Sequence, residues 1–250
     1  PSKRIKATGM TLCLGSVPIF YAPYWYRALD NRTLGFSPRV GYRSTMGAYL
    51  LMGYKYQADE NWRLTTHLDL RSRRGVAAGQ DLDWDHLLGQ GVGKIAFYYA
   101  QDLAVEDFHT GAELAQVEQN RYRVRLQHTQ PLTPRDYIVT ELNYLGDPYV
   151  IEDFFESEHR DHAEPENFLS LTHRGDNFTA GLVLRQRLNE FYTAVNRQPE
   201  AYLDVARQEV PYTPFYYESR SSLGNLQKVW AEGSTNEDFT AIRFDSRHYL

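Results

Sequence analysis

Long hydrophobic runs and cysteines are scarce in this sequence of 250 residues. The mean hydropathy is -0.57, and no stretch approaches the roughly 18 consecutive apolar residues that a membrane-spanning helix needs. A bundle of such helices is therefore excluded for this chain. Cys13 is the single cysteine and cannot close a disulfide within these residues, so the redox compartment stays open. We expect it to be a small buried residue on a strand.

An excess of positive charge is also missing, because the net charge is -5 at pH 7. Lys and Arg are spread evenly instead of forming the basic stripe that nucleic-acid binding needs, so we set nucleic acid aside as a partner. The sequence begins at Pro1 with no initiator methionine and no signal peptide. We therefore expect a piece of a longer chain, whose location cannot be judged from a leader.

Complete catalytic and metal-binding motifs are absent. DLDWDH (81–86) has the spaced aspartates of a calcium loop, but it lacks the glycine at the sixth position and the glutamate at the twelfth. GQGVGK (89–94) has the wrong spacing for a phosphate loop. His159 and His162, with His173 further on, lack the helical spacing of a zinc protease. We predict no enzyme activity, no cofactor and no metal.

A strict alternation of two kinds of side chain marks residues 62–71, WRLTTHLDLR. The even-numbered residues from Trp62 to Leu70 are mainly apolar, and the odd-numbered ones from Arg63 to Arg71 are mainly polar or charged. A period of two predicts a β-strand with two unlike faces. Similar alternation occurs in residues 47–56, 121–128, 178–187 and 242–247, and less regular strand candidates are 94–100, 137–145, 202–207 and 215–223.

These segments predict an all-β chain of about ten to twelve strands in an antiparallel meander. ADEN (58–61) is expected to be a hairpin turn, and the only helical signal is a short turn near residues 113–119. Two acidic connections, 102–120 and 146–167, are long enough to be the longer loops on one rim of a barrel.

The function depends on which solvent each strand face meets. In a soluble sandwich the apolar set points into a core and the charged set into water, whereas in an outer-membrane barrel the apolar set meets lipid and the charged set a wet lumen. The aromatic content of 14% suits strands in general and the interface girdles of such barrels in particular. The pattern alone leaves both alternatives open.

Several blocks in order carry a family resemblance. They are VPIFYAPY (17–24), DNRTLGF (30–36), a strand pair closing on SRRG (72–75), and ELNYLGDPYVIEDFFESEHR (141–160), with YYES (216–219) as a weaker match. Together they resemble the outer-membrane lipopolysaccharide-assembly family, LptD or OstA, from about residue 17 to residue 217. Cys13 cannot be matched to the cysteines that tie the two domains together in some members.

The resemblance implies an antiparallel up-and-down outer-membrane β-barrel, of which this chain is the N-terminal part and therefore open. Residues 1–16 would end a periplasmic N-terminal domain, and residues 17–250 would begin the barrel. The implied function is insertion of lipopolysaccharide into the outer leaflet of a Gram-negative outer membrane through a lateral seam. The implied partners are lipopolysaccharide, a plug lipoprotein (LptE-like) and a periplasmic bridge protein (LptA-like).

The resemblance also suggests roles for individual residues. Prolines weaken strand pairing, so Pro18, Pro23 and Pro38 are candidates for the lateral seam, with simple edge or turn prolines as the alternative. Arginine forks suit phosphates of the lipid headgroup, whereas rim salt bridges are the simpler explanation at turns. The headgroup candidates are Arg32, Arg73 and Arg74, and the candidates for the lumen wall are Arg63, Arg71, Arg121, Arg123 and Arg125.

Two other functions remain open from the sequence. A general porin or receptor-type barrel would share the strand pattern but has no reason to carry the matched blocks. A soluble β-sandwich that binds carbohydrate through its aromatic residues would fold in plain buffer, whereas the barrel would aggregate without detergent.

Overall fold

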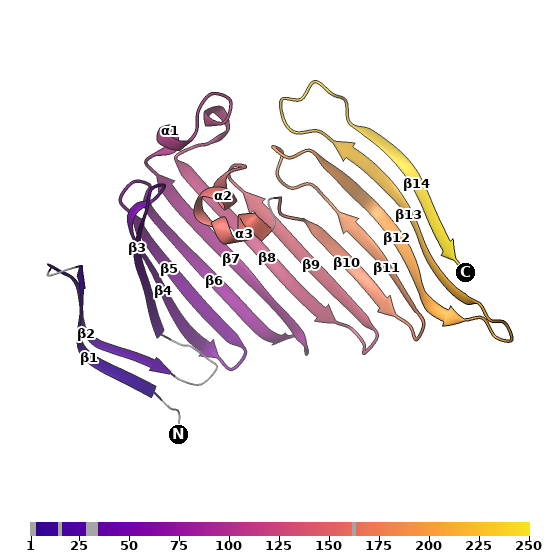
Figure 1. The fold of residues 1–250 in the computed structure, drawn as a ribbon, viewed down its shortest axis with the longest axis horizontal. Helices are drawn as coiled ribbons and strands as arrows, with labels where there is room; N and C mark the ends of the chain where they lie inside the picture. The colour runs from indigo at the N-terminus through magenta and orange to yellow at the C-terminus, as the bar shows by residue number, and fades with distance from the viewer. Residues whose placement is uncertain (1–3, 15–16, 29–34, 162–163) are drawn as a thin grey trace.

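Two antiparallel β-sheets make up most of the computed structural model, which describes residues 4–14, 17–28, 35–161 and 164–250 (Figure 1). The smaller sheet pairs β1 (Arg4–Leu14) with β2 (Val17–Ala28) and places Cys13 opposite Pro18. The domain boundary predicted between residues 16 and 17 falls between these two strands and stays a prediction.

The larger sheet has twelve strands, and each is hydrogen-bonded to its neighbours in the sequence. This order is an up-and-down antiparallel meander, which confirms the predicted fold class. Its two edge strands, β3 and β14, do not pair with each other in the described part of the chain, so the sheet is open. In chain order the strands are β3 (Gly35–Arg43), β4 (Gly47–Asp59), β5 (Trp62–Arg71), β6 (Gly75–Leu87), β7 (Gly91–Asp102), β8 (Asn120–Pro131), β9 (Asp136–Leu145), β10 (Phe168–Arg174), β11 (Phe178–Arg185), β12 (Ala194–Glu209), β13 (Tyr216–Val229) and β14 (Phe239–Tyr249).

The alternating segments of the sequence form strands as predicted. Residues 62–71 are β5 with the predicted bounds, and the hairpin with β4 turns at residues 60–61. In the register of the sheet, Leu68 of β5 lies between Met52 and Ala78, and Asp69 lies between Leu51 and Ala77. Residues 81–86 lie within β6, so the spaced aspartates belong to a strand and not to a calcium loop.

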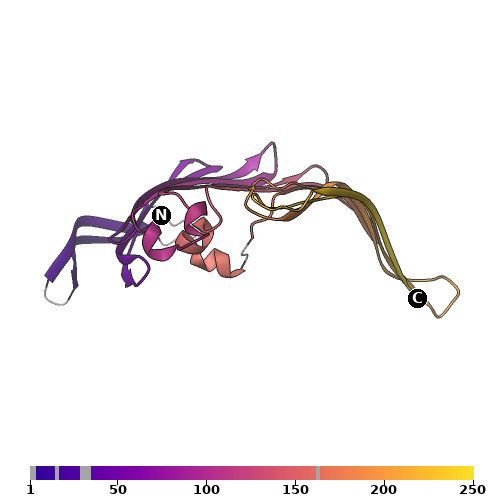
Figure 2. The same cartoon turned by 90° about the horizontal axis from the view of Figure 1, so that it is seen from above.

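The large sheet is curved, and its two edges bend toward the same side (Figure 2). Four short helices lie on this concave side: α1 (Val105–Phe108), the 3-10 helix η1 (Leu114–Gln116), α2 (Val150–Phe154) and α3 (Glu156–Asp161). Among the described residues, no helix has the length and apolar content needed to cross a membrane.

The two ends of the strands carry different connections, as is typical of outer-membrane barrels, which have short turns at one rim and longer loops at the other. At one end all five connections are short: residues 60–61, 88–90, 132–135, 175–177 and 210–215. The opposite end has the short turns 44–46 and 72–74 and also the longer connections, including 103–119 and 146–167. These two contain the four helices of the described residues.

The second long connection does not stay at the rim. Its helices α2 and α3 lie over the concave side of β7, β8 and β9 (Figure 1). Val150 and Ile151 pack against Leu145 of β9, and Phe154 packs against Ala77 and Ala100. Because these apolar side chains are buried at the sheet, the connection forms a cover over the inner surface. The sequence did not predict this packing.

Candidate functional site

The two faces of the large sheet have opposite character. On the convex face Leu68 and Leu70 are 46% and 40% exposed, and Phe97 and Tyr99 on β7 are 48% and 49% exposed. On the concave face Asp69, Arg71 and Arg121 are buried. A soluble protein places its apolar side chains inside and its charges outside. The observed arrangement is the reverse and matches a wall with lipid on its convex side.

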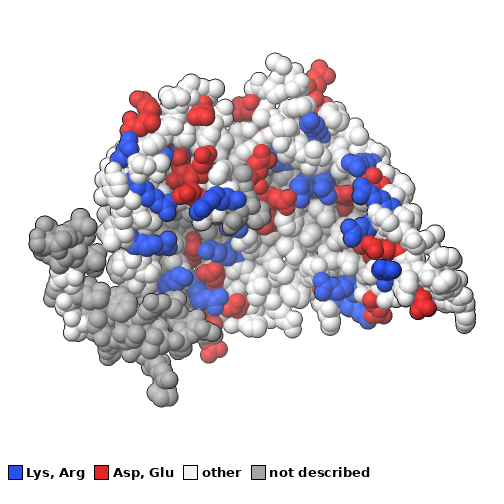
Figure 3. All heavy atoms as spheres, in the orientation of Figure 1, with Lys and Arg blue, Asp and Glu red and all other residues white. Residues whose placement is uncertain are grey.

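Charged side chains of both signs are interleaved over the concave face (Figure 3). Every lumen candidate from the sequence lies there. Arg63 pairs with Asp85, and Arg71 pairs with Asp69, which also accepts a hydrogen bond from the Tyr98 hydroxyl. The three remaining candidates are consecutive inward positions of β8, namely Arg121, Arg123 and Arg125.

The SRRG turn between β5 and β6 brings two arginines to this face. Gly75 has φ = +89°, and a Cβ atom there would lie 2.6 Å from the carbonyl oxygen of Gln101, so the position requires glycine. Arg74 points into a buried cluster, whereas Arg73 is half exposed and donates to the carbonyl of Ser44. Arg73 therefore has contacts at the turn, and its role toward a headgroup stays a prediction.

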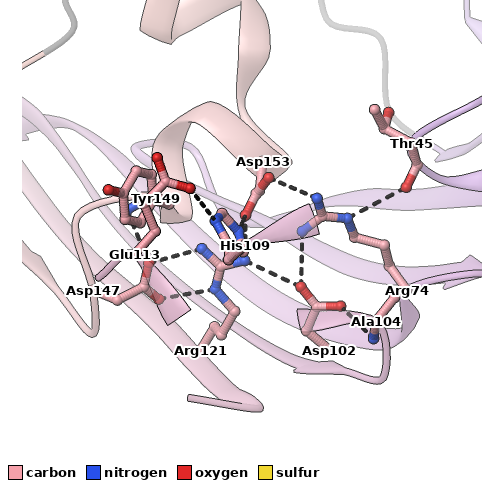
Figure 4. Close-up of polar contacts among 10 residues, drawn as sticks. All are labelled: Thr45, Arg74, Asp102, Ala104, His109, Glu113, Arg121, Asp147, Tyr149 and Asp153. Atoms are coloured by element: carbon pink, nitrogen blue, oxygen red, sulfur yellow. Dashed lines mark hydrogen bonds and ion pairs between the residues drawn. The ribbon is translucent and has the colours of Figure 1, made fainter. Parts of the chain in front are cut away.

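Arg121 is the centre of the buried cluster (Figure 4). Its Nε and Nη2 atoms donate to the two carboxylate oxygens of Asp147 at 2.8 and 2.7 Å, a two-pronged arrangement that fits a guanidinium well. Its Nη1 atom donates to Asp102 at 3.1 Å and also to Asp153. The side chain of Arg121 is fully buried.

Arg74 closes the other side of the cluster. It donates to Asp102 at 2.8 Å, to Asp153 at 2.7 Å and to the carbonyl of Thr45 at 3.3 Å. His109, from the first long connection, places its Nε2 atom 2.9 Å from Asp153. The cluster therefore joins the ends of β5, β7 and β8 to both long connections (Figure 4).

Asp153 is the member of the cluster that lies on α2. Burial alone would raise the pKa of its carboxyl group, but the hydrogen bond from Arg74 and the positive charge of Arg121 outweigh it and hold the pKa below the usual value. Asp153 is therefore a carboxylate at neutral pH. Its negative charge fastens α2 to the arginines of the sheet.

Aromatic rings of the covering connection lie against the same arginines. Phe154 lies 5.0 Å from the guanidinium of Arg71, 5.2 Å from that of Arg121 and 5.6 Å from that of Arg74. Phe155 lies 4.7 Å from that of Arg123. Cation–π contacts of this kind strengthen when they are desolvated. The FF pair of the matched block thus complements the arginines of β5 and β8.

The outer end of the cover is held by α3. Glu158 accepts hydrogen bonds from Arg123 at 2.8 Å and from Arg125 at 2.9 Å, and Glu156 accepts one from Arg43 at 2.6 Å. These pairs are more exposed than the central cluster. Pairs that are open to solvent in this way contribute about 1 kcal/mol or less each.

Four members of the central cluster were missed from the sequence: Asp102, His109, Asp147 and Asp153. Asp147 and Asp153 belong to the matched block at 141–160, but nothing in a linear pattern pairs a loop carboxylate with a particular strand arginine. An excess of arginines on one inward face was the available signal, because buried cations require anionic partners.

The seam candidates are only partly described. Pro18 and Pro23 lie in β2, and Pro38 lies in the edge strand β3 opposite Met52. Arg32 lies outside the described residues. The structure therefore does not bring the three prolines into one described site, and their role stays a prediction.

Within the described part of the chain, no group of three or more His, Cys, Asp or Glu side chains is arranged to hold a metal ion. Each carboxylate of the central cluster is bound to arginine. The cluster can therefore hold a loop in place over a polar surface, which is a structural role.

These features define a class of protein: an open antiparallel meander with an exposed apolar convex face and a charged concave face is part of the wall of an outer-membrane type β-barrel. It is not a two-sheet sandwich.

Comparison with known proteins agrees with this class. No family model matches the chain. The LPS-assembly protein LptD of Pseudomonas putida strain GB-1 is 28% identical over 184 residues, which is 70% of this chain and 19% of that protein. The protein of the same name from Pseudomonas syringae pv. syringae is 24% identical over 216 residues, which is 83% of this chain and 22% of that protein. The chain is thus similar to members of the LptD/OstA family, and it spans about a fifth of the length of these curated relatives.

Proposed function

We propose that this chain is the N-terminal part of an outer-membrane barrel that inserts lipopolysaccharide into the outer leaflet of a Gram-negative cell envelope. The observation that carries the proposal is the two-faced sheet, with exposed leucines and aromatic rings on its convex side and paired charges on its concave side. Similarity to LPS-assembly proteins supports it and makes a general porin the weaker alternative.

Each face has a role in this proposal. The convex face contacts lipid, where an arginine at mid-depth would cost about 2–4 kcal/mol. The concave face offers a hydrated, hydrogen-bonding surface along which a sugar chain can move without contact with lipid. No step of this process requires bond chemistry, so the protein acts as a conduit and not as an enzyme.

The exit route is a lateral seam at the N-terminal edge of the barrel. Pro38 lies in β3, the first strand of the large sheet, and proline cannot donate a ladder hydrogen bond. Pro18 and Pro23 lie in the preceding strand β2. A plug lipoprotein (LptE-like) would occupy the lumen, and a periplasmic bridge protein (LptA-like) would deliver lipopolysaccharide from the periplasmic side.

Depletion of the full-length protein in its own host tests the function. The expected result is a loss of surface lipopolysaccharide together with accumulation at the inner membrane or in the periplasm. Unchanged surface lipopolysaccharide with reduced uptake of small solutes would instead identify a general pore.

Replacement of the prolines tests the seam. Pro23→Ala with Pro38→Ala should tighten strand pairing and slow export, whereas Pro134→Ala, in the short turn 132–135, should not. Equal export rates for the unmodified protein, the double variant and Pro134→Ala would contradict a role of these prolines in a lateral seam.

A further inference from the structure

A cavity of about 620 Å³, lined mainly by polar and charged residues, opens on the concave face, apart from the buried cluster. It lies between the end of the second long connection, the loop 186–193 and strands β11 to β14. Its volume is in the range of sites that bind small ligands. The cover formed by α2 and α3 does not line it.

Three ion pairs line this cavity, and all three are partly open to solvent. They are Arg185 with Glu166 at 3.0 Å, Arg197 with Glu200, and Arg243 with Asp245. Each pair presents N–H donors beside carboxylate acceptors on the same wall. A guanidinium has five donors, so one carboxylate contact leaves others for a ligand.

The remaining charges of the lining are Arg187 and Glu164. Arg187 donates to the carbonyl oxygens of Glu190, Tyr192 and Trp230, which holds the loop before β12 in place. With these two residues the lining carries four arginines and four carboxylates, so its formal charges cancel.

The lining of this cavity selects against two classes of ligand. A phosphate or other anion would face four carboxylates, whose negative charges offset the attraction of the arginines. An acyl chain would remove paired charges from water without replacing their hydrogen bonds. Hydroxyl groups both donate and accept, so neighbouring hydroxyls of a sugar can contact an arginine and its carboxylate together.

Tyr192 adds a polar group of fixed protonation to the same wall. Burial, with the negative charges of Glu164 and Asp147, raises its pKa to about 12. Its hydroxyl is therefore neutral and donates to the carbonyl of Pro148 at 3.3 Å. The loop that lines the cavity is thereby tied to the start of the covering connection.

We propose that this cavity is a sugar-binding subsite on the inner wall, which takes an uncharged, hydroxyl-rich segment of a carbohydrate chain. The proposal rests on the proposed function only for the source of the sugar, which would be a neutral-sugar stretch of the lipopolysaccharide chain. The ion pairs provide hydrogen-bond donors and acceptors to the sugar hydroxyls. Because the formal charges of the lining cancel, no strong net attraction holds the sugar, and it can dissociate.

The test uses the purified full-length protein in detergent, with a photo-crosslinking amino acid at Leu188. Leu188 lines the cavity and is 37% exposed. The matched control position is Leu203, which is 42% exposed on the convex face of β12. The probe is a labelled outer-core oligosaccharide from the host's lipopolysaccharide, freed of acyl chains and phosphates.

The expected result is a crosslink at Leu188 and none at Leu203. Excess unlabelled oligosaccharide should compete, and inorganic phosphate at the same concentration should not. Replacing Arg197→Gln together with Glu200→Gln keeps the charge balance but should weaken binding at least about tenfold, because hydrogen bonds to charged groups are lost. Arg135→Gln, which breaks the exposed pair with Asp176 at the opposite rim, should leave binding unchanged.

No crosslink at Leu188 would overturn the proposal. Competition by phosphate would also overturn it, since it would show an anion site. If depletion abolishes export but Leu188 takes no crosslink, the subsite fails while the proposed function stands. If depletion leaves surface lipopolysaccharide intact but Leu188 still crosslinks, the function fails and the cavity remains a carbohydrate site.

Discussion

The two faces of strands β5 to β8 are built from alternate residues of the same segments, yet they are stabilised in opposite ways. On the convex face Leu68, Leu70 and Phe97 are exposed, and no other described segment of the chain covers them. On the concave face Arg71 and Arg121 are buried under α2 and held by carboxylates. The comparison shows that side chains of the large sheet are buried where the covering connection packs on them. The apolar convex face is left for lipid to cover.

The largest expected effect comes from breaking the concave side at Arg121. Arg121→Leu removes the cation shared by Asp102, Asp147 and Asp153, and an uncompensated buried charge costs about 3–5 kcal/mol. Hydrogen–deuterium exchange of residues 146–158 in the full-length protein should show loss of protection. Arg125→Leu is the matched control: its side chain is 27% exposed, so it should cost about 1 kcal/mol or less. Equal effects of the two changes would contradict the buried cluster.

The convex side is tested by placing a charge on it. Leu68→Arg should lower the free energy of unfolding from phospholipid vesicles by about 2–4 kcal/mol if this face meets lipid near mid-depth. His67→Arg puts the same side chain one position away on the concave face, near Asp81, and should be tolerated. Urea titrations of both variants give the difference. A smaller loss for Leu68→Arg than for His67→Arg would reverse the assignment of the faces.

A smaller effect is expected at the turn that carries Arg74 to the cluster. Gly75→Ala forces a Cβ atom to within 2.6 Å of the Gln101 carbonyl oxygen at a positive φ, and such strain costs about 1–3 kcal/mol. Gly89→Ala also has a positive φ, +100°, but nothing lies within 4 Å of its Cβ position. Thermal unfolding of the two variants should separate the clash from the backbone strain. Equal melting temperatures would show that the turn can shift to make room.

The smallest effect is a pH dependence of the cover. The pKa of Asp153 is lower in the folded protein than in an unfolded chain. Its contribution is therefore fully present above the ordinary aspartate pKa of about 3.9. It is lost as the pH falls through the lower, folded value. Protection of α2 against hydrogen exchange, corrected for intrinsic rates, should be constant from pH 7 to about pH 5 and should fall below about pH 4. Asp153→Asn should remove this dependence, and an unchanged profile in that variant would assign it to another group.

The strands could be predicted from the sequence because alternation is local. A period of two in residues 62–71 is enough to define β5 and its two faces. The solvent of each face could not be decided, since the same pattern serves a soluble sandwich and a barrel. The structure distinguishes the two, because Leu68 and Phe97 of the apolar face are exposed.

Only the arginines of the central cluster could be predicted from the sequence, and their carboxylate partners could not. The arginines of β8 were visible as consecutive inward positions, and their shared face was correctly inferred. The carboxylates that pair with Arg121 come from the end of β7, at Asp102, and from the second long connection, at Asp147 and Asp153. Which carboxylate meets which arginine depends on how α2 packs on Ala77 and Ala100, a contact between distant parts of the sequence.

A nitroxide scan along residues 62–71 tests the central claim most directly. Single cysteines are introduced into the full-length protein in a background without Cys13 or other free cysteines, labelled and reconstituted into bilayers. The account predicts a period of two, with labels at positions such as 68 and 70 accessible to oxygen in the lipid. Labels at 67 and 69 should respond instead to a water-soluble relaxing agent or be shielded. Equal access of the water-soluble agent to positions 68 and 70 would contradict the account, because the apolar face would then not be the one that meets lipid.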